Sequence, residues 1–474
     1  MKPPKAKTSR SPRTLVGVTP AEVVGQIERA LDPLASVLKK AALNRAERSR
    51  RQYEAPPPAA QARPRAYLSP LAVPFPAIPP VAGVDLAAVR AGLHRRQRPD
   101  VMVMRFAPGT IAAGVFTRHA AAAAPVDWSR GQFEVNGGEA RVLVANSGCA
   151  NAFTGKAGFD ASRRLAAAAA RRLGCRQREV LLAATGPIGP MLDDAKIAAR
   201  LPQLSAGLSP DAWQDAARAI MTTDTFPKGA FATAEVEGAP VRIAGVAKGS
   251  GMVSPDMATV LAFIATDAAI TQPALQNLVG LYTRMSFNRV TVDGDSSPND
   301  CCLLFATGRS GAPLISRAGD RRLADFREKL EQVMLDLAWQ IVRDGEGATK
   351  FITVEVTGAE SPHSARRIAR TIAESPGVKA ALGGETADWG RVVAAVGDCA
   401  EPVKRERLGL RFGDLAVVAD GAVAPGYREA ELLDYVKRQE IGISVEAGVG
   451  RSSATVWTCD LTRRYVDINQ NPRA

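Results

Sequence analysis

One threonine stands where its own main chain would let it act as a nucleophile. Thr259 follows the stretch Lys248-Gly-Ser-Gly-Met-Val-Ser-Pro-Asp-Met-Ala258 and precedes the apolar run 260–265. The two glycines and the proline of this stretch indicate a shaped loop that enters a buried strand. If the Ala258–Thr259 bond were cut, Thr259 would carry both a nucleophilic oxygen and an amine able to serve as its base. The competing interpretation is a glycine turn that leads into a core strand.

Histidine, phosphate-loop and metal chemistries have little support. The three histidines, His94, His119 and His363, lie among basic or loop-like residues, and nothing local places one beside a serine. Neither GxxxxGK[ST] nor a strand followed by GxGxxG occurs. The six cysteines include no CxxC pair, which argues against a zinc site and against a disulfide framework. Catalysis by this chain would therefore use something other than histidine, and no zinc site is indicated.

Five other stretches gather hydroxyl, amide and carboxylate side chains between apolar runs. They are residues 146–155, 185–186, 222–228, 293–300 and 344–350. The first two directly follow apolar runs, and strand ends with glycine-rich loops are where α/β proteins gather ligand-binding backbone groups. Each stretch alone is more often a turn or a helix cap than a site, so their order along the chain has to provide the argument.

The elements that would position these stretches alternate between strands and helices. Strands are expected at 101–106 and 111–116 around the turn Pro108-Gly109, and at 140–145, 180–184, 260–265 and 351–356. Helices are expected from a cap at Asp160 to near Gly174, and at 323–343, where apolar residues form one stripe. This pattern predicts a mixed α/β (α+β) core.

Composition favours a globular protein of two or three domains. The chain has 474 residues, of which 46% are hydrophobic and 23% charged. No apolar run approaches the roughly 18 residues that cross a bilayer, and the N-terminus lacks the apolar core of a secretory signal. We therefore expect a soluble cytoplasmic protein without a membrane partner.

The net charge of +13 belongs mainly to the N-terminal segment. Residues 1–65 hold 14 Lys and Arg against 5 Asp and Glu. A helix is expected after Thr19-Pro20, and proline-rich sequence covers 55–80, so residues 1–68 are predicted to be a partly helical or disordered extension. No interleaved aromatic and basic pattern occurs, so no nucleic-acid partner is expected.

A dozen motifs stand in a fixed order along the chain. They are Phe75-Pro-Ala-Ile-Pro-Pro-Val-Ala-Gly83, Ala113-Gly-Val-Phe-Thr117, Ala145-Asn-Ser-Gly-Cys-Ala-Asn-Ala152, Ala184-Thr-Gly186, Met221-Thr-Thr-Asp-Thr225, Ala247-Lys-Gly-Ser-Gly-Met252, Asp256-Met-Ala-Thr259, Asp293-Gly-Asp295, Asp344-Gly-Glu-Gly-Ala-Thr-Lys350, Thr371-Ile-Ala-Glu-Ser-Pro376, Trp389-Gly-Arg391 and Tyr465-Val-Asp-Ile-Asn469. From about Ser69 to the C-terminus, this order closely resembles the ornithine acetyltransferases, also called glutamate N-acetyltransferases, of arginine biosynthesis.

The resemblance implies a fold and a processing event. The family has a two-part α/β fold, with strands sandwiched by helices, and cleaves itself before the motif threonine. For this chain that implies an α part, 69–258, preceded by the extension 1–68, and a β part, 259–474, joined as α2β2 or a larger assembly.

The resemblance also implies the roles of individual residues. Thr259 would be the nucleophile, with its freed amine as base, and Thr185 with Gly186 would form the oxyanion hole. The substrate-binding positions are Thr225, Lys248, Thr259, Glu346, Asn469 and Ala474. By charge, Lys248 suits a substrate α-carboxylate and Glu346 suits an ornithine ammonium group. No cofactor is implied.

The implied reaction is a ping-pong acyl transfer. Thr259 would take the acetyl group from N-acetylornithine, and glutamate would then attack the acetyl-threonine ester. The amine of a chain terminus has a pKa of roughly 7.7 to 8.0, so a neutral fraction is present near neutral pH. Whether acetyl-CoA also serves as donor, which would make the enzyme multifunctional, stays open.

Departures from the family pattern concern substrate binding. Ala474 ends the chain where the family usually has Ser or Thr, Thr386-Ala387-Asp388 precedes Trp389 where Asp-Pro-Asn is usual, and Pro298 replaces a common Thr. Two alternatives also remain. One is an amidohydrolase or aminopeptidase that uses Thr259 with water as acceptor, and the other is a non-catalytic protein whose basic tail binds a polyanion.

Overall fold

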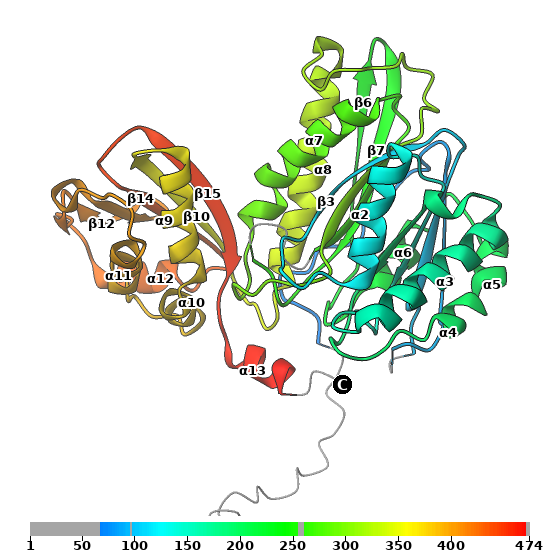
Figure 1. Ribbon diagram of the computed structural model, residues 1–474. Helices are drawn as coiled ribbons and strands as arrows, with labels where there is room; N and C mark the ends of the chain where they lie inside the picture. Colours follow the sequence, from blue (N-terminus) through cyan, green and yellow to red (C-terminus); the bar gives the residue numbers. More distant parts are fainter. Residues whose placement is uncertain (1–66, 95–96, 255–259, 471–474) are drawn as a thin grey trace, which may run out of the picture. The chain divides into compact units, whose positions relative to one another are not determined.

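The computed structural model of the chain describes residues 67–94, 97–254 and 260–470 (Figure 1). Residues from Tyr67 onward cluster as one unit. An extension is expected over 1–68, and its residues 1–66 lie outside the described residues. The helix expected after Thr19-Pro20 is among them. Ala258, Thr259 and Ala474 also lie outside the described residues.

The larger part of the described chain is built around two sheets. The first has the order β1-β2-β4-β5 and consists of β1 (Val84–Val89), β2 (Val101–Phe106), β4 (Val142–Asn146) and β5 (Val180–Ala184). The second has the order β3-β9-β8-β7-β6 and consists of β3 (Ile111–Phe116), β6 (Lys228–Val236), β7 (Ala239–Lys248), β8 (Leu261–Thr266) and β9 (Cys301–Ala306). In each sheet one neighbouring pair is parallel, β4 with β5 and β8 with β9.

These two sheets pack face to face. One apolar cluster combines Met102, Leu143 and Leu181 of the first sheet with Phe263 and Phe305 of the second. Because successive strand residues point to opposite faces, the neighbouring positions supply two further clusters on the outer faces. The arrangement is therefore a sandwich of helices, sheet, sheet and helices.

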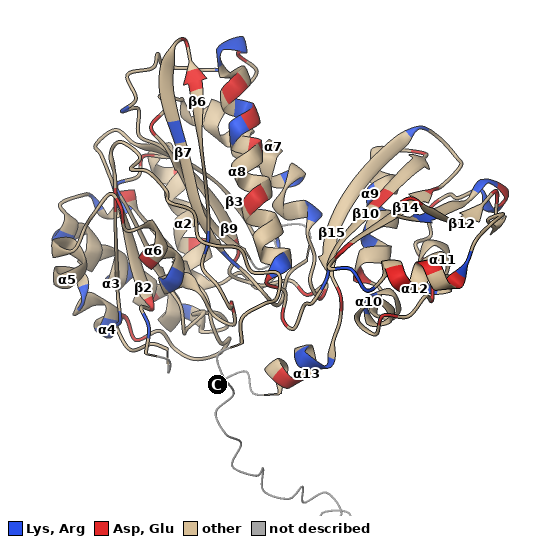
Figure 2. Cartoon of the chain, turned by 180° about the vertical axis from the view of Figure 1, so that it is seen from behind, with Lys and Arg blue, Asp and Glu red and all other residues tan. Residues whose placement is uncertain are grey.

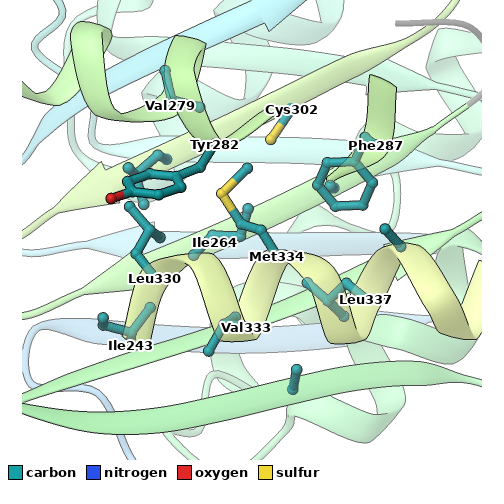
Figure 3. Packing of buried hydrophobic residues seen from close by; sticks show 14 of the residues in the cluster. Ile243, Ile264, Val279, Tyr282, Phe287, Cys302, Leu330, Val333, Met334 and Leu337 are labelled. Carbon is teal, nitrogen blue, oxygen red and sulfur yellow. The ribbon is translucent and has the colours of Figure 1, made fainter. Parts of the chain in front are cut away.

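Helices cover both outer faces. Those beside the first sheet are α2 (Ala124–Asn136), α3 (Gly155–Leu173), α4 (Asp194–Ala198) and α5 (Leu201–Ala206), and α6 (Trp213–Ile220) packs into the cluster between the sheets. The second sheet is covered by α7 (Gln272–Met285) and α8 (Ala324–Arg343). Figure 3 shows Val279 and Tyr282 of α7, and Leu330 to Leu337 of α8, meeting Ile243 and Ile264 of the sheet.

A third sheet follows in the sequence, with the order β13-β12-β11-β14-β10-β15. Its strands are β10 (Phe351–Ala359), β11 (Gly409–Phe412), β12 (Leu415–Ala419), β13 (Ala422–Val423), β14 (Glu440–Glu446) and β15 (Ser452–Cys459). The helices of this region are α9 (Pro362–Glu374), α10 (Pro376–Gly383), α11 (Gly390–Asp398), α12 (Glu429–Tyr435) and α13 (Arg463–Asn469). Short 3-10 helices occupy Gln177–Glu179, Phe287–Arg289, Arg321–Leu323 and Arg405–Arg407.

The predicted mixed α/β class is confirmed, and several predicted elements match closely. Strands β2, β3 and β5 have the expected bounds, and α8 begins one residue later than expected. The prediction that Asp160 caps the start of a helix was wrong, because α3 already begins at Gly155. Asp160 instead pairs with Lys156 one turn earlier. The end of α3 at Gly174 is confirmed, since this glycine has a φ of 69°.

Charged residues lie mainly outside the packed strands. Figure 2 shows blue and red segments mostly on helices and loops, whereas the strands are largely tan. Within the described part of the chain, no helix is both long and apolar enough to cross a bilayer.

Candidate active site

The predicted oxyanion residues follow the last residue of β5. The Thr185 amide donates to Asn146 O at 2.9 Å, and Thr185 O accepts from the Cys149 amide at 3.1 Å. Gly186 has a φ of 131°, and a Cβ there would lie 2.6 Å from Cys149 N. Only glycine fits this approach of two backbones, so the loop after β4 holds the Thr185-Gly186 turn in place.

Lys248 joins the two sheets at this point. It is the last residue of β7, and its Nζ donates to Thr185 Oγ1 at 3.3 Å, 63 positions away in sequence. Both side chains are buried. Burial lowers the pKa of the Lys248 ammonium, and the nearby Asp224 carboxylate opposes that shift. Two of the predicted site residues are thus in contact.

The start of β8 lies beside Lys248. In the β7–β8 ladder Lys248 pairs with Leu261, and the carbonyl of Val260 accepts from the Cys301 amide at 3.0 Å. Val260 is covalently bonded to Thr259, and consecutive Cα atoms are about 3.8 Å apart. The predicted nucleophile and scissile bond lie outside the described residues, but the described chain resumes next to the Lys248–Thr185 pair.

A buried ion triad lies next to this pair. Lys228, at the start of β6, donates to Asp224 Oδ1 at 2.7 Å and to Asp344 Oδ2 at 2.5 Å, and all three side chains have no exposed surface. Asp224 also reaches the loop after β7, because its Oδ1 accepts from the Gly249 amide at 2.8 Å. The triad therefore connects β6, the end of α8 and the residue after Lys248.

The two carboxylates of the triad have pKa values that are shifted in opposite directions. Burial raises the pKa of Asp344 to about 6, and the Asp224 charge acts in the same direction. The pKa of Asp224 is lowered despite its burial, because Lys228 and Lys248 both favour its ionised form. Lys228 itself has a raised pKa because the two carboxylates outweigh its burial. We infer that Asp344 takes up a proton before Asp224 does.

Thr225 belongs to the triad's surroundings. Its hydroxyl donates to Asp344 Oδ1 at 2.5 Å and accepts from the Ser69 amide at 3.0 Å. The Thr225 amide also donates to Asp344. This predicted substrate-binding hydroxyl is therefore engaged with protein groups, close to Lys228.

Glu346 and Asn469, two of the predicted substrate-binding residues, lie in contact. Asn469 Nδ2, on α13, donates to Glu346 Oε2 at 2.6 Å. The Glu346 amide donates to Ser250 O at 2.7 Å, and a Cβ on Gly251 would lie 2.5 Å from the Glu346 carboxyl carbon. Glu346 thus lies against the stretch that leads to Thr259, on a loop that also carries Asp344.

Four buried charged residues of this region lie in polar stretches that the sequence marked, but none of them was predicted as a site residue, namely Asp224, Lys228, Asp300 and Asp344. Asp300 precedes β9, and burial raises its pKa well above the usual value, opposed by Lys248. The local signal was Asp224 and Lys228 close together in sequence before an apolar strand, whereas the third partner, Asp344, is 116 positions from Lys228. Among the described residues, no group of His, Cys, Asp and Glu could hold a metal ion.

Sequence comparison matches most of this chain to known proteins. The model of the ArgJ family matches residues 85–474. The arginine biosynthesis bifunctional protein ArgJ of Caulobacter vibrioides is 62% identical over 403 residues, which cover 85% of this chain and all of that protein. The chain belongs to the ArgJ family.

Two solved structures of such proteins are also similar. The arginine biosynthesis bifunctional protein ArgJ of Bacillus halodurans is 37% identical, with a TM-score of 0.42, and covers 43% of this chain and 96% of its own. The ornithine acetyltransferase of Mycobacterium tuberculosis, in complex with ornithine, is 31% identical, with a TM-score of 0.32, and covers 38% of this chain and 94% of its own.

Membership of the ArgJ family confirms the resemblance found in the sequence. It makes this chain an acyltransferase of arginine biosynthesis and supports the predicted glutamate N-acetyltransferase activity. Neither the hydrolase alternative nor the non-catalytic binding protein is favoured. The individual roles of the site residues remain predictions.

Replacing the triad lysine should destabilise this ArgJ-family chain in a pH-dependent way. In a chain kept whole by Thr259→Ala, Lys228→Met leaves two buried carboxylates unpaired, and we expect a loss of about 3–5 kcal/mol of unfolding free energy at pH 8. The loss should shrink at pH 5, because the folded variant then protonates Asp344 more readily than the unfolded chain does. Urea unfolding at both pH values measures this.

The matched control is Lys156→Met, which removes a surface ion pair with Asp160, where Lys156 is 88% exposed. It should change the unfolding free energy little at either pH. An equally small effect of Lys228→Met would contradict the importance of the triad.

Proposed function

We propose that Thr259 is the nucleophile, first of self-cleavage and then of acetyl transfer. In the first stage Thr259 Oγ attacks the Ala258 carbonyl carbon, the bond from that carbon to the Thr259 nitrogen breaks, and an ester forms. Water then hydrolyses the ester. The products are fragments 1–258 and 259–474, the second beginning with a free amine that can accept a proton from its own hydroxyl.

In the second stage the same oxygen carries the acetyl group. Thr259 Oγ attacks the acetyl carbon of N-acetylornithine, the amide bond breaks, and ornithine leaves with the proton as an amine. The glutamate amine then attacks the acetyl-threonine ester, which releases N-acetylglutamate and restores the hydroxyl. The two half-reactions share one site, so the kinetics should be ping-pong.

The observation that carries this proposal is the Lys248–Thr185 contact beside the start of β8. Since Lys248 Nζ donates to Thr185 Oγ1, that oxygen acts as the acceptor and its own hydrogen is free to point elsewhere. We assign this hydrogen and the Gly186 amide to the oxyanion of the tetrahedral intermediate. Such preorganised donors stabilise the charge that develops in acyl transfer.

Charge suggests how the substrates are held. The Lys248 ammonium would bind the substrate α-carboxylate, and the Glu346 carboxylate, held by Asn469, would bind the ornithine ammonium group. Thr225 and Ala474 are the remaining proposed substrate positions. Ala474 offers no hydroxyl, so it would contribute one hydrogen bond fewer than a Ser or Thr there.

We extend the proposal to the donor and the assembly. The curated relatives are named bifunctional, which supports acetyl-CoA as a second acetyl donor for the same threonine. The α and β fragments should remain together, because the contacts of the Asp344–Glu346 loop with residues 225, 228 and 250 cross the cleavage point. We propose α2β2 or a larger assembly of these fragments.

Thr259→Ala tests the nucleophile. The variant should stay a single chain of 50.0 kDa without acetyl transfer, whereas the wild type should yield a fragment whose N-terminal residue is Thr259. Intact mass and N-terminal sequencing measure both outcomes. Thr259→Ser keeps a hydroxyl and serves as the matched control, which should still cleave. A Thr259→Ala variant that is cut or active would overturn the assignment.

The donors and the acceptor are tested with the processed wild type. N-acetylornithine with glutamate should give equal amounts of ornithine and N-acetylglutamate, and acetyl-CoA should replace N-acetylornithine as donor. Omitting glutamate should stop turnover after one acetyl group per site. Free acetate without N-acetylglutamate would instead indicate a hydrolase, and product from N-acetylornithine alone among donors would restrict the chain to one donor.

Thr185→Val tests the oxyanion role. Valine keeps the shape of threonine but removes the hydroxyl, so we expect kcat per cleaved chain to fall by about 10²-fold to 10³-fold. Thr185→Ser keeps the hydroxyl and should retain most of the activity. The comparison uses chains counted by their free Thr259 N-terminus, so that slower cleavage is not mistaken for slower transfer. Equal kcat in Thr185→Val and the wild type would remove Thr185 from the mechanism.

A further inference from the structure

Two residues that precede the proposed cleavage point, Met252 and Val253, are held by an acidic loop from beyond it. Asp293 Oδ2 accepts from the Met252 amide at 2.6 Å, and Asp293 Oδ1 accepts from the Val253 amide at 2.9 Å. Met252 has a φ of 57°, a left-handed conformation that costs a non-glycine residue roughly 1 kcal/mol or more. The two hydrogen bonds from main-chain amides to the Asp293 carboxylate hold the chain in this conformation.

The carbonyl of Val253 is held by the same loop. It accepts from the Val292 amide at 2.9 Å, from the Gly294 amide at 3.3 Å and from Thr291 Oγ1 at 3.1 Å. Both polar groups of the Val253 main chain therefore bond to residues 291–294. The Val253 main chain is thus fixed to this loop through both its amide and its carbonyl.

Helix α9 holds the next residue. Arg370 Nη2 donates to Ser254 Oγ at 2.9 Å, and Ser254 Oγ lies 3.4 Å from Glu374 Oε1. Arg370 also donates to Glu374 at 2.9 Å through its Nε, so the helix presents an ion pair to the serine. Glu374 is the last residue of α9, within the motif Thr371-Ile-Ala-Glu-Ser-Pro376, to which no role in acetyl transfer has been assigned above.

We infer that Asp293 and Glu374 are positioning residues for self-cleavage, an inference that rests on the cleavage proposed above. Neither residue need touch the reacting atoms. They hold residues 252–254, while the Val260 carbonyl is held by Cys301 on the other side of the scissile bond. The chain is thus fixed four residues before Ala258 and one residue after Thr259. Fixing both ends removes conformations in which the hydroxyl is poorly aligned for attack on the preceding carbonyl carbon.

The proposed role ends when the chain is cut. Residues 252–254 belong to the α part, and Asp293 and Glu374 belong to the β part, so after cleavage these bonds only join the two fragments. Thr259 is then no longer connected through the chain to Ser254. Loss of the bonds should therefore slow cleavage while leaving acetyl transfer by already cleaved chains nearly unchanged.

The test measures cleavage and transfer separately in the full chain. Asp293→Asn keeps the shape and one oxygen acceptor but turns an amide group toward one of the two main-chain amides, and Glu374→Gln weakens the bonds to Arg370 and Ser254. Cell-free synthesis followed by denaturing gels gives the half-time of cleavage. We expect this half-time to lengthen at least tenfold for Asp293→Asn and severalfold for Glu374→Gln.

Three controls separate positioning from general destabilisation. Asp434→Asn makes the same chemical change at an exposed carboxylate of α12 and should cleave like the wild type. The kcat per free Thr259 N-terminus should stay within twofold of the wild type for both test variants. Their thermal unfolding, measured with Thr259→Ala in each chain to prevent cutting, should remain cooperative. If Asp293→Asn fails to fold, the cleavage half-time of Glu374→Gln alone tests the positioning role.

The outcomes are distinct. Cleavage of both variants at the wild-type rate overturns the positioning role, and so does a fall of kcat in proportion to the slower cleavage, because the residues would then serve the site or the fold in general. A wild-type chain that stays uncut overturns the proposed self-cleavage itself. Slow cleavage with normal transfer supports the inference.

Discussion

The site depends on a lysine that is buried between two carboxylates. Lys228 has no exposed surface and reaches both Asp224 and Asp344, which come from different parts of the chain. Withdrawing such charges from water is costly, so the arrangement is stable only while all three groups remain paired. Because Asp224 also accepts from the Gly249 amide, the position of the loop after Lys248 is tied to that pairing. The loop that carries Glu346 is tied to it through Asp344.

The sandwich of two sheets supplies the geometry that the triad maintains. Lys248 ends β7 in one sheet, Thr185 follows β5 in the other, and the packed apolar layer between Leu143 and Phe263 sets the separation of the sheets. Close-packed interiors resist small displacements, so the lysine reaches the threonine without a flexible segment in between. A rigid frame of this kind suits acyl transfer, in which the donors must already point at the developing charge.

In the proposed mechanism the same region has two tasks with different requirements. Acetyl transfer would need Thr185, Gly186 and Lys248 around a free terminal residue, whereas cleavage would need the uncut main chain to hold one conformation. The first set comes from strand ends. The second set, Asp293 and Glu374, comes from a loop and a helix end that bond to the residues before the cut. Separate groups of contacts would thus serve the two proposed steps, although one hydroxyl is proposed to perform both.

Local patterns in the sequence determined the strands around residues 101–106 and 180–184, the long helix α8 and the ArgJ family, because periodicity, turns and ordered motifs are all short-range signals. The same patterns could not decide that β2 and β3, adjacent in sequence, belong to different sheets. Nor could they place Lys228 against Asp344, Lys248 against Thr185 or Asp293 against Met252, since these partners lie between 41 and 116 positions apart. Such contacts form only when the chain has folded, because a buried polar or charged group is costly unless it is paired with another group. The partner can then come from a distant part of the sequence.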